Sequence, residues 1–327
     1  MIALRIIYSL VSTKLASAGL VIGVSLLGIS GWMWGQYATT KQVPNLPVAT
    51  SALRLDHPLY SYSIYGVDQP LGVAVSPDGQ RLYVTEGGGD RLVRILDPKG
   101  NPLGSFSAGD SKTGYRKPMY VAVSPEGLVY VTDMARQGID IFSARGEYHT
   151  TLKPDFRQGE NWQPLAMTFD KAGKLYVTDV YPDNQRVLVF RRDGSLERQI
   201  TGSFAFANGI AVDGGGRIFV ADSNNGRVQV FGAEGQPLQA FAEGAGGIKM
   251  ALPRGLALDP QGRLGVVDTF NQSIQVFRTD PSPAFQFSLG EEGAGDGQFS
   301  YPNSLAVDGQ GRMYVTDREN NRVQVWF

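Results

Sequence analysis

The stretches "NGIAVDGGGRIFVADSNNGRVQVF" (Asn208–Phe231) and "PNSLAVDGQGRMYVTDRENNRVQVWF" (Pro302–Phe327) are two copies of one pattern. Six copies occur between Pro70 and Phe327 at intervals of about 45 residues, which indicates a repeat architecture. We expect features present in every copy to build the scaffold and features present in one copy to carry function. Each copy starts at a proline or its equivalent, namely Pro70, Pro118, Pro164, Ala207, Pro253 and Pro302.

Each copy predicts four strands. A small residue and then a glycine follow the start at constant spacing, with turn-forming residues between them, which predicts a strand, a tight turn and a second strand. The second strand ends in an acidic residue, and a third strand such as "RVQVF" alternates polar and apolar residues. A fourth strand precedes the next proline, as in "AFQFSLG" (Ala284–Gly290). The chain is therefore expected to be an all-β, six-bladed β-propeller of four-stranded antiparallel blades.

The recurring side chains are explained as scaffold. Small first-strand residues suit the crowded axis, and the recurring acid is expected to accept backbone N–H hydrogen bonds from the following turn. A recurring arginine, at Arg91, Arg186, Arg227 and Arg322, is expected to pair with the acid. The last copy ends in a third strand. We therefore predict that Leu59–Gly66 supplies its fourth strand by pairing with Arg322–Phe327, which closes the ring.

The most specific copy is "GEEGAGDGQFSYPNSLAVDGQGRMYVTDRENNRVQVWF" (Gly290–Phe327). Its glycine-rich lead-in, proline and core resemble the NHL-repeat six-bladed β-propeller family, in its membrane-anchored bacterial type, and the resemblance covers Leu59–Phe327. The first three copies match more loosely, and Gly138 and Ser273 stand where the pattern has arginine. Some proteins that resemble this fold are lyases or lactonases with a metal at the mouth of the channel, so the resemblance implies either binding or catalysis.

The composition excludes several classes of function. The chain of 327 residues has 30 Lys and Arg against 31 Asp and Glu, and this balance argues against nucleic-acid binding. Cysteine is absent, which excludes disulfides, thiolate metal sites and a cysteine nucleophile. The two histidines, His57 in the linker and His149 beyond a third strand, do not suit the histidine site of amidating lyases. No cofactor is predicted.

The N-terminal part predicts a membrane anchor. "LASAGLVIGVSLLGISGWMWG" (Leu15–Gly35) has no charged residue and, as a helix, is long enough to cross a bilayer. We expect a cytoplasmic segment at 1–14, a transmembrane signal-anchor helix at 15–37, a proline-containing linker at 38–58 and the propeller at 59–327. This makes a single-pass protein of the cytoplasmic membrane, with the N-terminus inside and the propeller on the extracytoplasmic side. A cleaved signal peptide is the alternative.

Four glycines of this segment have the spacing of helix-association motifs. Gly19 with Gly23 and Gly31 with Gly35 are G-x-x-x-G pairs, which allow two membrane helices to approach closely. Glycine is also common in such helices, so chance pairing is the alternative.

Two kinds of connection are expected to share one face of the ring: the links into the first strands and the turns after the acids. Side chains there that differ between copies are candidate binding residues for a protein partner, such as a subunit of a membrane complex. We expect the aromatic ones to be exposed; the alternative is that they cover the blade ends. The candidates are Tyr120, Arg136, Trp162, Tyr181, Asn208, Arg254, Phe270, Tyr301, Asn303 and Arg318.

The alternative function is a metal-dependent hydrolase or lyase, similar to a lactonase, with its site at the mouth of the channel. Glu86, Asn208 and Asn303 offer the oxygen ligands that hard cations take, but nothing in their spacing singles them out. No metal site and no catalytic residue is predicted, and small-molecule binding in the channel is left open. The sequence thus favours a membrane-anchored binding or scaffold propeller.

Overall fold

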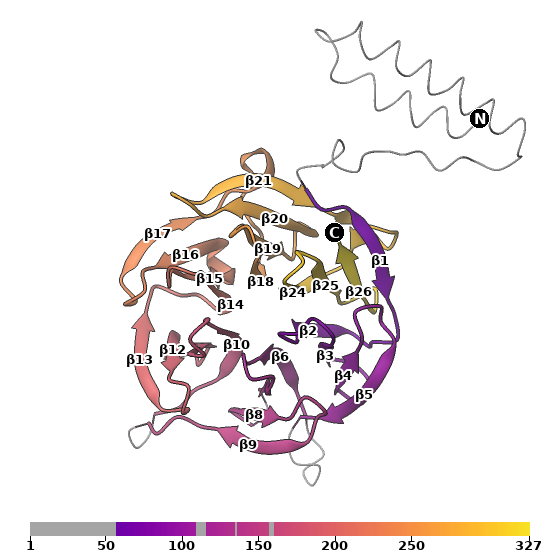
Figure 1. Ribbon diagram of the computed structural model, residues 1–327. Coiled ribbons are helices and arrows are strands. Elements are labelled where there is room, and N and C mark those ends of the chain that lie inside the picture. Colours follow the sequence, from indigo (N-terminus) through magenta and orange to yellow (C-terminus); the bar gives the residue numbers. More distant parts are fainter. Residues whose placement is uncertain (1–56, 109–115, 135, 157–159) are drawn as a thin grey trace, which may run out of the picture. The chain divides into compact units, whose positions relative to one another are not determined.

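The computed structural model describes residues 57–108, 116–134, 136–156 and 160–327. Within them, six four-stranded antiparallel sheets surround a common axis (Figure 1), which confirms the predicted all-β six-bladed propeller. The predicted anchor helix at 15–37 and the linker up to residue 56 lie outside the described residues. In the described part of the chain, no helix is long and apolar enough to cross a membrane.

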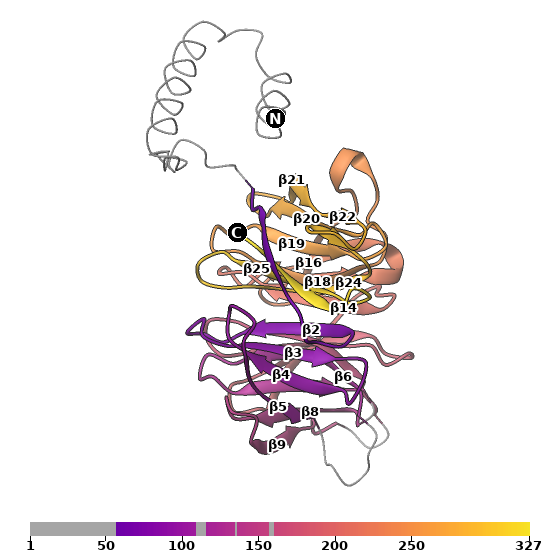
Figure 2. The same ribbon diagram turned by 90° about the vertical axis from the view of Figure 1, so that its right-hand side faces the viewer.

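We number the blades 1 to 6 in the order of their first strands, which begin at Pro70, Pro118, Pro164, Ala207, Pro253 and Pro302. In blades 1 to 5 the four strands follow one another in sequence from the axis to the rim, as Figure 2 shows for β2 to β5 of blade 1. Two short 3-10 helices, η1 and η2, and a parallel pair, β22 and β23, lie in the connections and were not predicted. The strands are β2 Pro70–Val75, β3 Leu82–Glu86, β4 Leu92–Leu96, β5 Pro102–Ser107, β6 Pro118–Val123, β7 Val129–Asp133, β8 Gly138–Phe142, β9 Tyr148–Leu152, β10 Pro164–Phe169, β11 Leu175–Asp179, β12 Arg186–Phe190, β13 Leu196–Thr201, β14 Ala207–Val212, β15 Ile218–Asp222, β16 Arg227–Phe231, β17 Pro237–Phe241, β18 Pro253–Leu258, β19 Leu264–Asp268, β20 Ser273–Arg278, β21 Ala284–Leu289, β22 Glu291–Glu292, β23 Gln298–Phe299, β24 Pro302–Val307, β25 Met313–Asp317, β26 Arg322–Trp326 and β1 Tyr60–Ile64, with η1 Ser223–Asn225 and η2 Ala245–Gly247.

Small first-strand residues lie where the blades meet at the axis. These residues line a cavity of about 280 Å³ at the axis. The cavity stays open because their side chains are small; larger side chains on six converging strands would fill it. Aromatic residues of the second strands, such as Tyr83, Phe219 and Tyr314, are fully buried instead. The small residues at the cavity are Ala74, Ala122, Thr168, Ala211, Ala257 and Ala306.

Ring closure occurs as predicted. β1 pairs with β26 in antiparallel register, so that Ile64 lies opposite Val323 and the last blade has the order β1-β26-β25-β24. Beyond the strand, the backbone N–H of Leu59 donates to the carbonyl of Phe327 at 3.1 Å, and that of Phe327 donates back at 2.8 Å. The last blade is therefore built from both ends of the propeller.

The recurring acids mainly hold a different connection from the one predicted. Asp317 accepts the backbone N–H of Ser300 at 2.7 Å, and Ser300 belongs to the link that leads into the first strand. Asp179 accepts both the N–H of Gln163 in that link, at 2.7 Å, and the predicted N–H of the following turn, from Tyr181 at 3.1 Å. The acid therefore fixes the link that delivers each first strand to the axis.

The predicted arginine–acid pairs form in three blades. Arg186, Arg227 and Arg322 contact the acids of their blades at 2.7 to 3.0 Å. In blade 1, Arg94 within β4 pairs with Glu86 at 2.8 Å, and Arg91, which precedes β4, donates to the carbonyl of Arg116 at 2.9 Å.

Hydroxyl groups connect neighbouring blades, a feature that was not predicted. Thr85, next to the acid of β3, donates to the carbonyl of Met119 at 2.7 Å. In blades 4 and 5 the position of Thr85 is taken by Ala221 and Val267, and the residue after the acid makes the contact instead. The six hydrogen bonds run from Thr85 to Met119, Thr132 to Leu165, Thr178 to Asn208, Ser223 to Pro253, Thr269 to Pro302 and Thr316 to Leu71.

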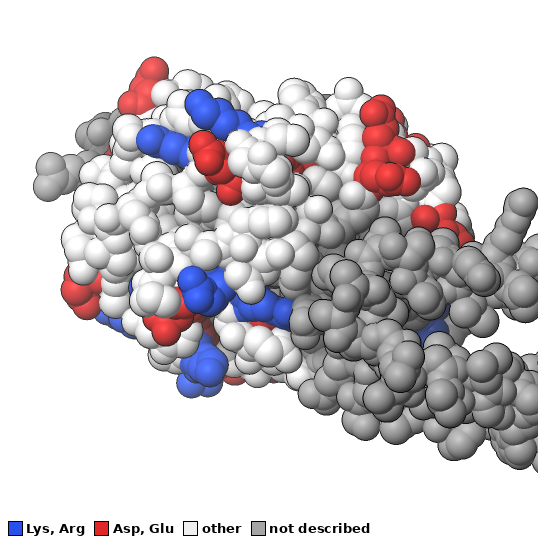
Figure 3. Space-filling model, turned by 90° about the horizontal axis from the view of Figure 1, so that it is seen from above, with Lys and Arg blue, Asp and Glu red and all other residues white. Residues whose placement is uncertain are grey.

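Charged side chains of both signs are scattered over the side of the propeller that Figure 3 shows, with uncharged surface between them. This view contains no continuous basic stripe, in keeping with the formal net charge of -1 for the whole chain.

Candidate functional site

The first strands begin and the second strands end at one side of the ring, which we name the top face. A cavity of about 280 Å³ opens there at the axis. The second residue of every first strand lines this cavity. The six blades therefore contribute equivalent positions to its wall, but the side chains at these positions differ in polarity. Blades 1 to 3 supply apolar side chains and blades 4 to 6 supply polar ones: Leu71, Met119, Leu165, Asn208, Arg254 and Asn303.

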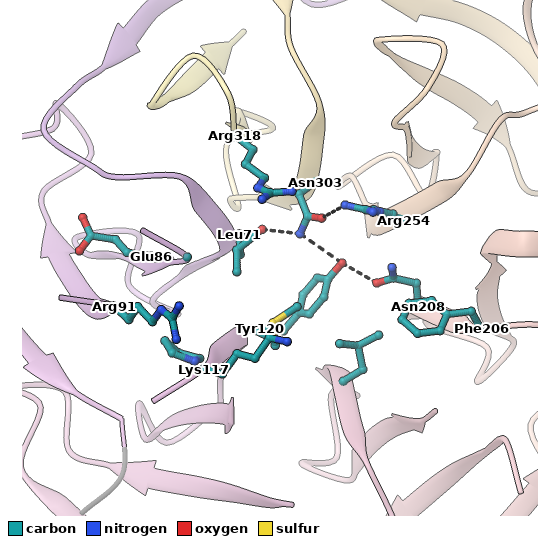
Figure 4. Close-up of a pocket in the computed structure, with 14 residues that line it drawn as sticks. Leu71, Glu86, Arg91, Lys117, Tyr120, Phe206, Asn208, Arg254, Asn303 and Arg318 are labelled. Carbon is teal, nitrogen blue, oxygen red and sulfur yellow. Dashed lines mark hydrogen bonds between the residues drawn. The ribbon is translucent and has the colours of Figure 1, made fainter. Parts of the chain in front are cut away.

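A chain of hydrogen bonds crosses this cavity (Figure 4). The hydroxyl of Tyr120 donates to Oδ1 of Asn208 at 2.6 Å, and Nδ2 of Asn303 contacts the same hydroxyl at 3.5 Å. Nδ2 of Asn303 also donates to the carbonyl of Leu71 at 2.8 Å, while its Oδ1 accepts from Nη1 of Arg254 at 2.6 Å. Side chains and backbone of five blades are thereby held in one arrangement.

Burial governs the protonation of this network. It raises the pKa of Tyr120 to about 12, so the hydroxyl stays protonated at neutral pH and can donate. Burial also lowers the pKa of Arg254; Tyr120 opposes this shift, and the positive charge of Arg318 adds to it. Arg254 still carries its charge at neutral pH, because an arginine begins from a very high value.

Two guanidinium N–H groups of the cavity lack hydrogen-bond partners. The Nε atoms of Arg254 and Arg318 are buried and make no hydrogen bond with the described residues. Nε of Arg318 lies 3.5 Å from a carboxylate oxygen of Glu319, whereas no carboxylate of the described residues lies within ion-pair distance of Arg254. An unpaired buried donor of this kind costs free energy unless something binds to it.

The structure brings five of the ten candidate binding residues together at this cavity: Tyr120, Asn208, Arg254, Asn303 and Arg318. Tyr120 was expected to be exposed, and this is wrong, because its ring is only 6% exposed and its hydroxyl points to Asn208. The same expectation is wrong for Trp162, which is 4% exposed, packs near Phe190 and donates from Nε1 to the carbonyl of Gln137 at 2.7 Å.

The remaining predicted residues lie away from the cavity. Arg136 pairs with Asp140 at 3.3 Å, and the hydroxyl of Tyr181 accepts from Asn161. Phe270 and Tyr301 are exposed as expected, at 56% and 43%. Their rings form an edge-to-face pair with centroids 6.0 Å apart.

Glu86, Asn208 and Asn303, the three oxygen donors considered for a cation, have other partners. Glu86 accepts from Arg94 at 2.8 Å, and its carboxylate points away from Tyr120 (Figure 4). The oxygens of the two asparagines accept from Tyr120 and Arg254. Across the described residues, no group of three or more His, Asp or Glu side chains could hold a metal ion.

Lys117 and Phe206 also line the cavity but were not among the candidates. Each directly precedes the first residue of a first strand. The same position in the last copy is Tyr301, which was a candidate, but the residue types at this position vary among the six copies and do not single out Lys117 and Phe206.

The fold and this cavity define the class of protein: a six-bladed β-propeller whose axis opens into a lined cavity on one face. The NHL repeat family matches residues 204–231, 250–277 and 299–326, which belong to blades 4, 5 and 6 and their incoming links. These three blades carry NHL repeats, which supports the resemblance to NHL-repeat propellers.

Two solved structures share the fold. One is described as a streptogramin B lyase structure and is 14% identical, with a TM-score of 0.61 over 83% of this chain and 98% of that chain. The other is hydrazine synthase of Kuenenia stuttgartiensis, 17% identical, with a TM-score of 0.58 over 78% of this chain and 82% of that chain. At these identities the likeness concerns the fold alone.

Blade 5 departs from the scaffold at its acid. Asp268 is 1% exposed and accepts from Ala251 N at 2.7 Å and from Asn271 Nδ2 at 2.8 Å, but Ser273 stands where three other blades have an arginine. Burial raises the pKa of Asp268 to about 6, which these hydrogen bonds only partly oppose. In the unfolded chain the pKa of the same carboxyl is about 3.9.

We expect Asp268 to make the folded chain more stable in mild acid. The folded state holds the proton of Asp268 more tightly than the unfolded state does. The stabilisation by Asp268 is therefore full below about pH 4, falls as the pH rises towards 6 and is lost above it. Lowering the pH from about 7 to about 5 should raise the free energy of unfolding by about 1 kcal/mol. Denaturant unfolding at both pH values measures this gain, and Asp268→Asn should abolish it. Ser273→Arg introduces the arginine that three other blades have, and it should reduce the gain in stability by stabilising the carboxylate of Asp268. Identical pH dependence in the parent and both variants would contradict the raised pKa of Asp268.

Proposed function

We propose that this chain is a binding propeller, anchored in the cytoplasmic membrane through residues 15–37, that docks a protein partner on its top face on the extracytoplasmic side. A subunit of a membrane complex is the partner class that fits an anchored module. The observation that carries the proposal is the exposed pair Phe270 and Tyr301 on that face. Exposed aromatic side chains are enriched among the residues that dominate interface energies.

The surroundings of this pair support docking. Ile248, in the link into β18, is 64% exposed. A groove of about 510 Å³ lies between the turns of blades 4 and 5, with Phe270 and Met250 among its lining residues. An anchoring side chain of a partner fits such a groove, because the residues that dominate interface energies fill well-packed pockets from which water is excluded.

The docking proposal is tested by affinity purification of the full chain from detergent-solubilised membranes. We expect a stoichiometric partner to co-purify with the parent chain and to be lost from the double variant Phe270→Ala, Tyr301→Ala, because truncating two interface aromatics costs about 2 kcal/mol or more. The matched control is Tyr148→Ala with Leu238→Ala, which removes two side chains of similar exposure from the outer strands β9 and β17. Purification of the isolated chain alone, or equal recovery from both double variants, would refute docking on this face.

A metal-dependent hydrolase or lyase is supported less well. The oxygen of Asn303 that a cation would need accepts a hydrogen bond from the positively charged Arg254. Since Arg254 and Arg318 both line the cavity, a cation at its centre would be repelled.

A further inference from the structure

The top-face cavity has an excess of positive charge. Lys117, Arg254 and Arg318 line it, together with Arg91, which donates to the carbonyl of Arg116. Among the described residues of the lining, Glu86 is the one acidic side chain. The carboxylate of Glu86 is neutralised by Arg94 and accepts the backbone N–H of Asp68, so it does not balance these cations. The mouth of the axis is therefore an electropositive site in a protein that carries almost no net charge.

Arg254 is held with unused hydrogen-bonding capacity at this site. Its Nη1 is fixed by Asn303, and Asn303 is fixed in turn by the carbonyl of Leu71. Its buried Nε has no hydrogen-bond partner among the described residues, and the Nε of Arg318 makes no hydrogen bond there either, with Glu319 at 3.5 Å as its ion-pair partner. Guanidinium groups that face one cavity without a carboxylate between them form a geometry suited to an anion, since arginine donates to carboxylates with two parallel N–H groups.

The wall opposite the arginines is apolar. Leu71, Met119 and Leu165 line the cavity from blades 1 to 3, and Phe206 adds an aromatic ring. The volume of about 280 Å³ has room for roughly nine groups of the size of a water molecule. An inorganic ion would leave the apolar wall unused, whereas an organic anion would cover it.

We propose that the top-face cavity binds an organic carboxylate, with its charged group on Arg254 and Arg318 and its apolar part against Leu71, Met119 and Leu165. Two sources supply this chemistry: a free organic acid, and the C-terminal carboxylate of a peptide. The site does not depend on the proposed docking of a partner, which uses Phe270 and Tyr301.

The purified full chain is titrated calorimetrically with benzoate and with its neutral analogue benzamide. We expect saturable binding of benzoate in the millimolar range or tighter and binding of benzamide weaker by about tenfold or more. Acetyl-Gly-Phe and its C-terminal amide form the second arm. A peptide acid that binds more tightly than benzoate identifies a chain end as the source, and the reverse order identifies a free acid.

Three variants assign the binding to the cavity. Arg254→Met should abolish benzoate binding, and Arg254→Lys should weaken it, because the charge remains while the two parallel N–H groups are lost. Arg278→Met removes an exposed arginine at the opposite end of blade 5 and should bind as the parent does. The melting temperature of ligand-free Arg254→Met should stay close to that of the parent, since the lost hydrogen bond to Asn303 is offset by removal of an unpaired charge.

Equal affinities for benzoate and benzamide, or no saturable benzoate binding up to about 10 mM, would overturn the proposal. So would undiminished benzoate binding by Arg254→Met. The variant Phe270→Ala, Tyr301→Ala should bind benzoate normally, so failure of this site and failure of partner docking are told apart.

Discussion

Deleting Leu59–Gly66 should lower the melting temperature of the propeller by more than about 10 °C, since about 2–4 °C accompany each kcal/mol in a domain of this size. The deletion removes β1, whose Ile64 is 2% exposed and whose Tyr62 hydroxyl donates to the carbonyl of Pro98 at 2.6 Å. It also removes the edge-to-face contact of Tyr60 with Trp326. Loss of these apolar contacts alone amounts to about 5 kcal/mol. Thermal unfolding followed by circular dichroism measures the shift.

The effect of the deletion is separated from general damage by two substitutions in β1. Ile64→Ala should reproduce part of the loss, about 2 kcal/mol or more, because it leaves a cavity beside Gly100. Ser61→Ala changes an exposed position of the same strand and should leave the melting temperature unchanged. A deletion variant as stable as the parent would refute the role of β1 in closing the ring.

Replacing Arg186 with methionine should destabilise the propeller by about 3–5 kcal/mol, the usual cost of leaving one partner of a buried ion pair alone. The side chain of Arg186 is 1% exposed and that of Asp179 is fully buried, with Nε and Oδ2 3.0 Å apart. Arg186 also donates to Gln199 at 2.9 Å and pairs with Glu160. Denaturant unfolding at neutral pH measures the difference.

Arg192→Met is the matched control, two residues beyond β12. Its ion pair with Glu126 is largely exposed, at 69% and 37%, so its removal should cost about 0.5 kcal/mol or less. Adding Asp179→Asn to Arg186→Met should restore part of the stability, because the second change removes the buried charge left behind. If Arg186→Met and Arg192→Met lower the free energy of unfolding by the same amount, burial does not determine how strongly these two ion pairs stabilise the fold.

The fold was predictable because each blade repeats the same local pattern. A proline or its equivalent, a small residue, a turn and an acid recur at nearly constant spacing, and the structure has a blade at each recurrence. The pair of Arg94 with Glu86 was not predictable, since the repeat places an arginine at Arg91 and only the geometry of blade 1 brings the other arginine within reach. The hydroxyl contacts between blades were missed because threonine in a strand is also explained by its preference for strands.

The positions that form the candidate site were predictable from the sequence, but which of their side chains are exposed was not. Comparing the six copies found Asn208, Arg254 and Asn303, which occupy equivalent positions and meet at the axis. The burial of Tyr120 depends on a partner across the ring, Asn208, at a separation of 88 residues. The burial of Trp162 depends on neighbouring aromatic rings. Repeat spacing carries no information about contacts of either kind.

The pairing of β1 with β26 also sets an order of events during synthesis. Strand β1 is made before the other strands of the propeller and must wait for β26, while blades 1 to 5 each have all four strands close in sequence. The hydrogen bond from Asn303 to Leu71 spans the same seam between blades 6 and 1. We therefore expect a nascent chain that lacks blade 6 to form the sheets of blades 1 to 5 first, while the wall of the cavity that Asn303 supplies is added only when blade 6 has been made.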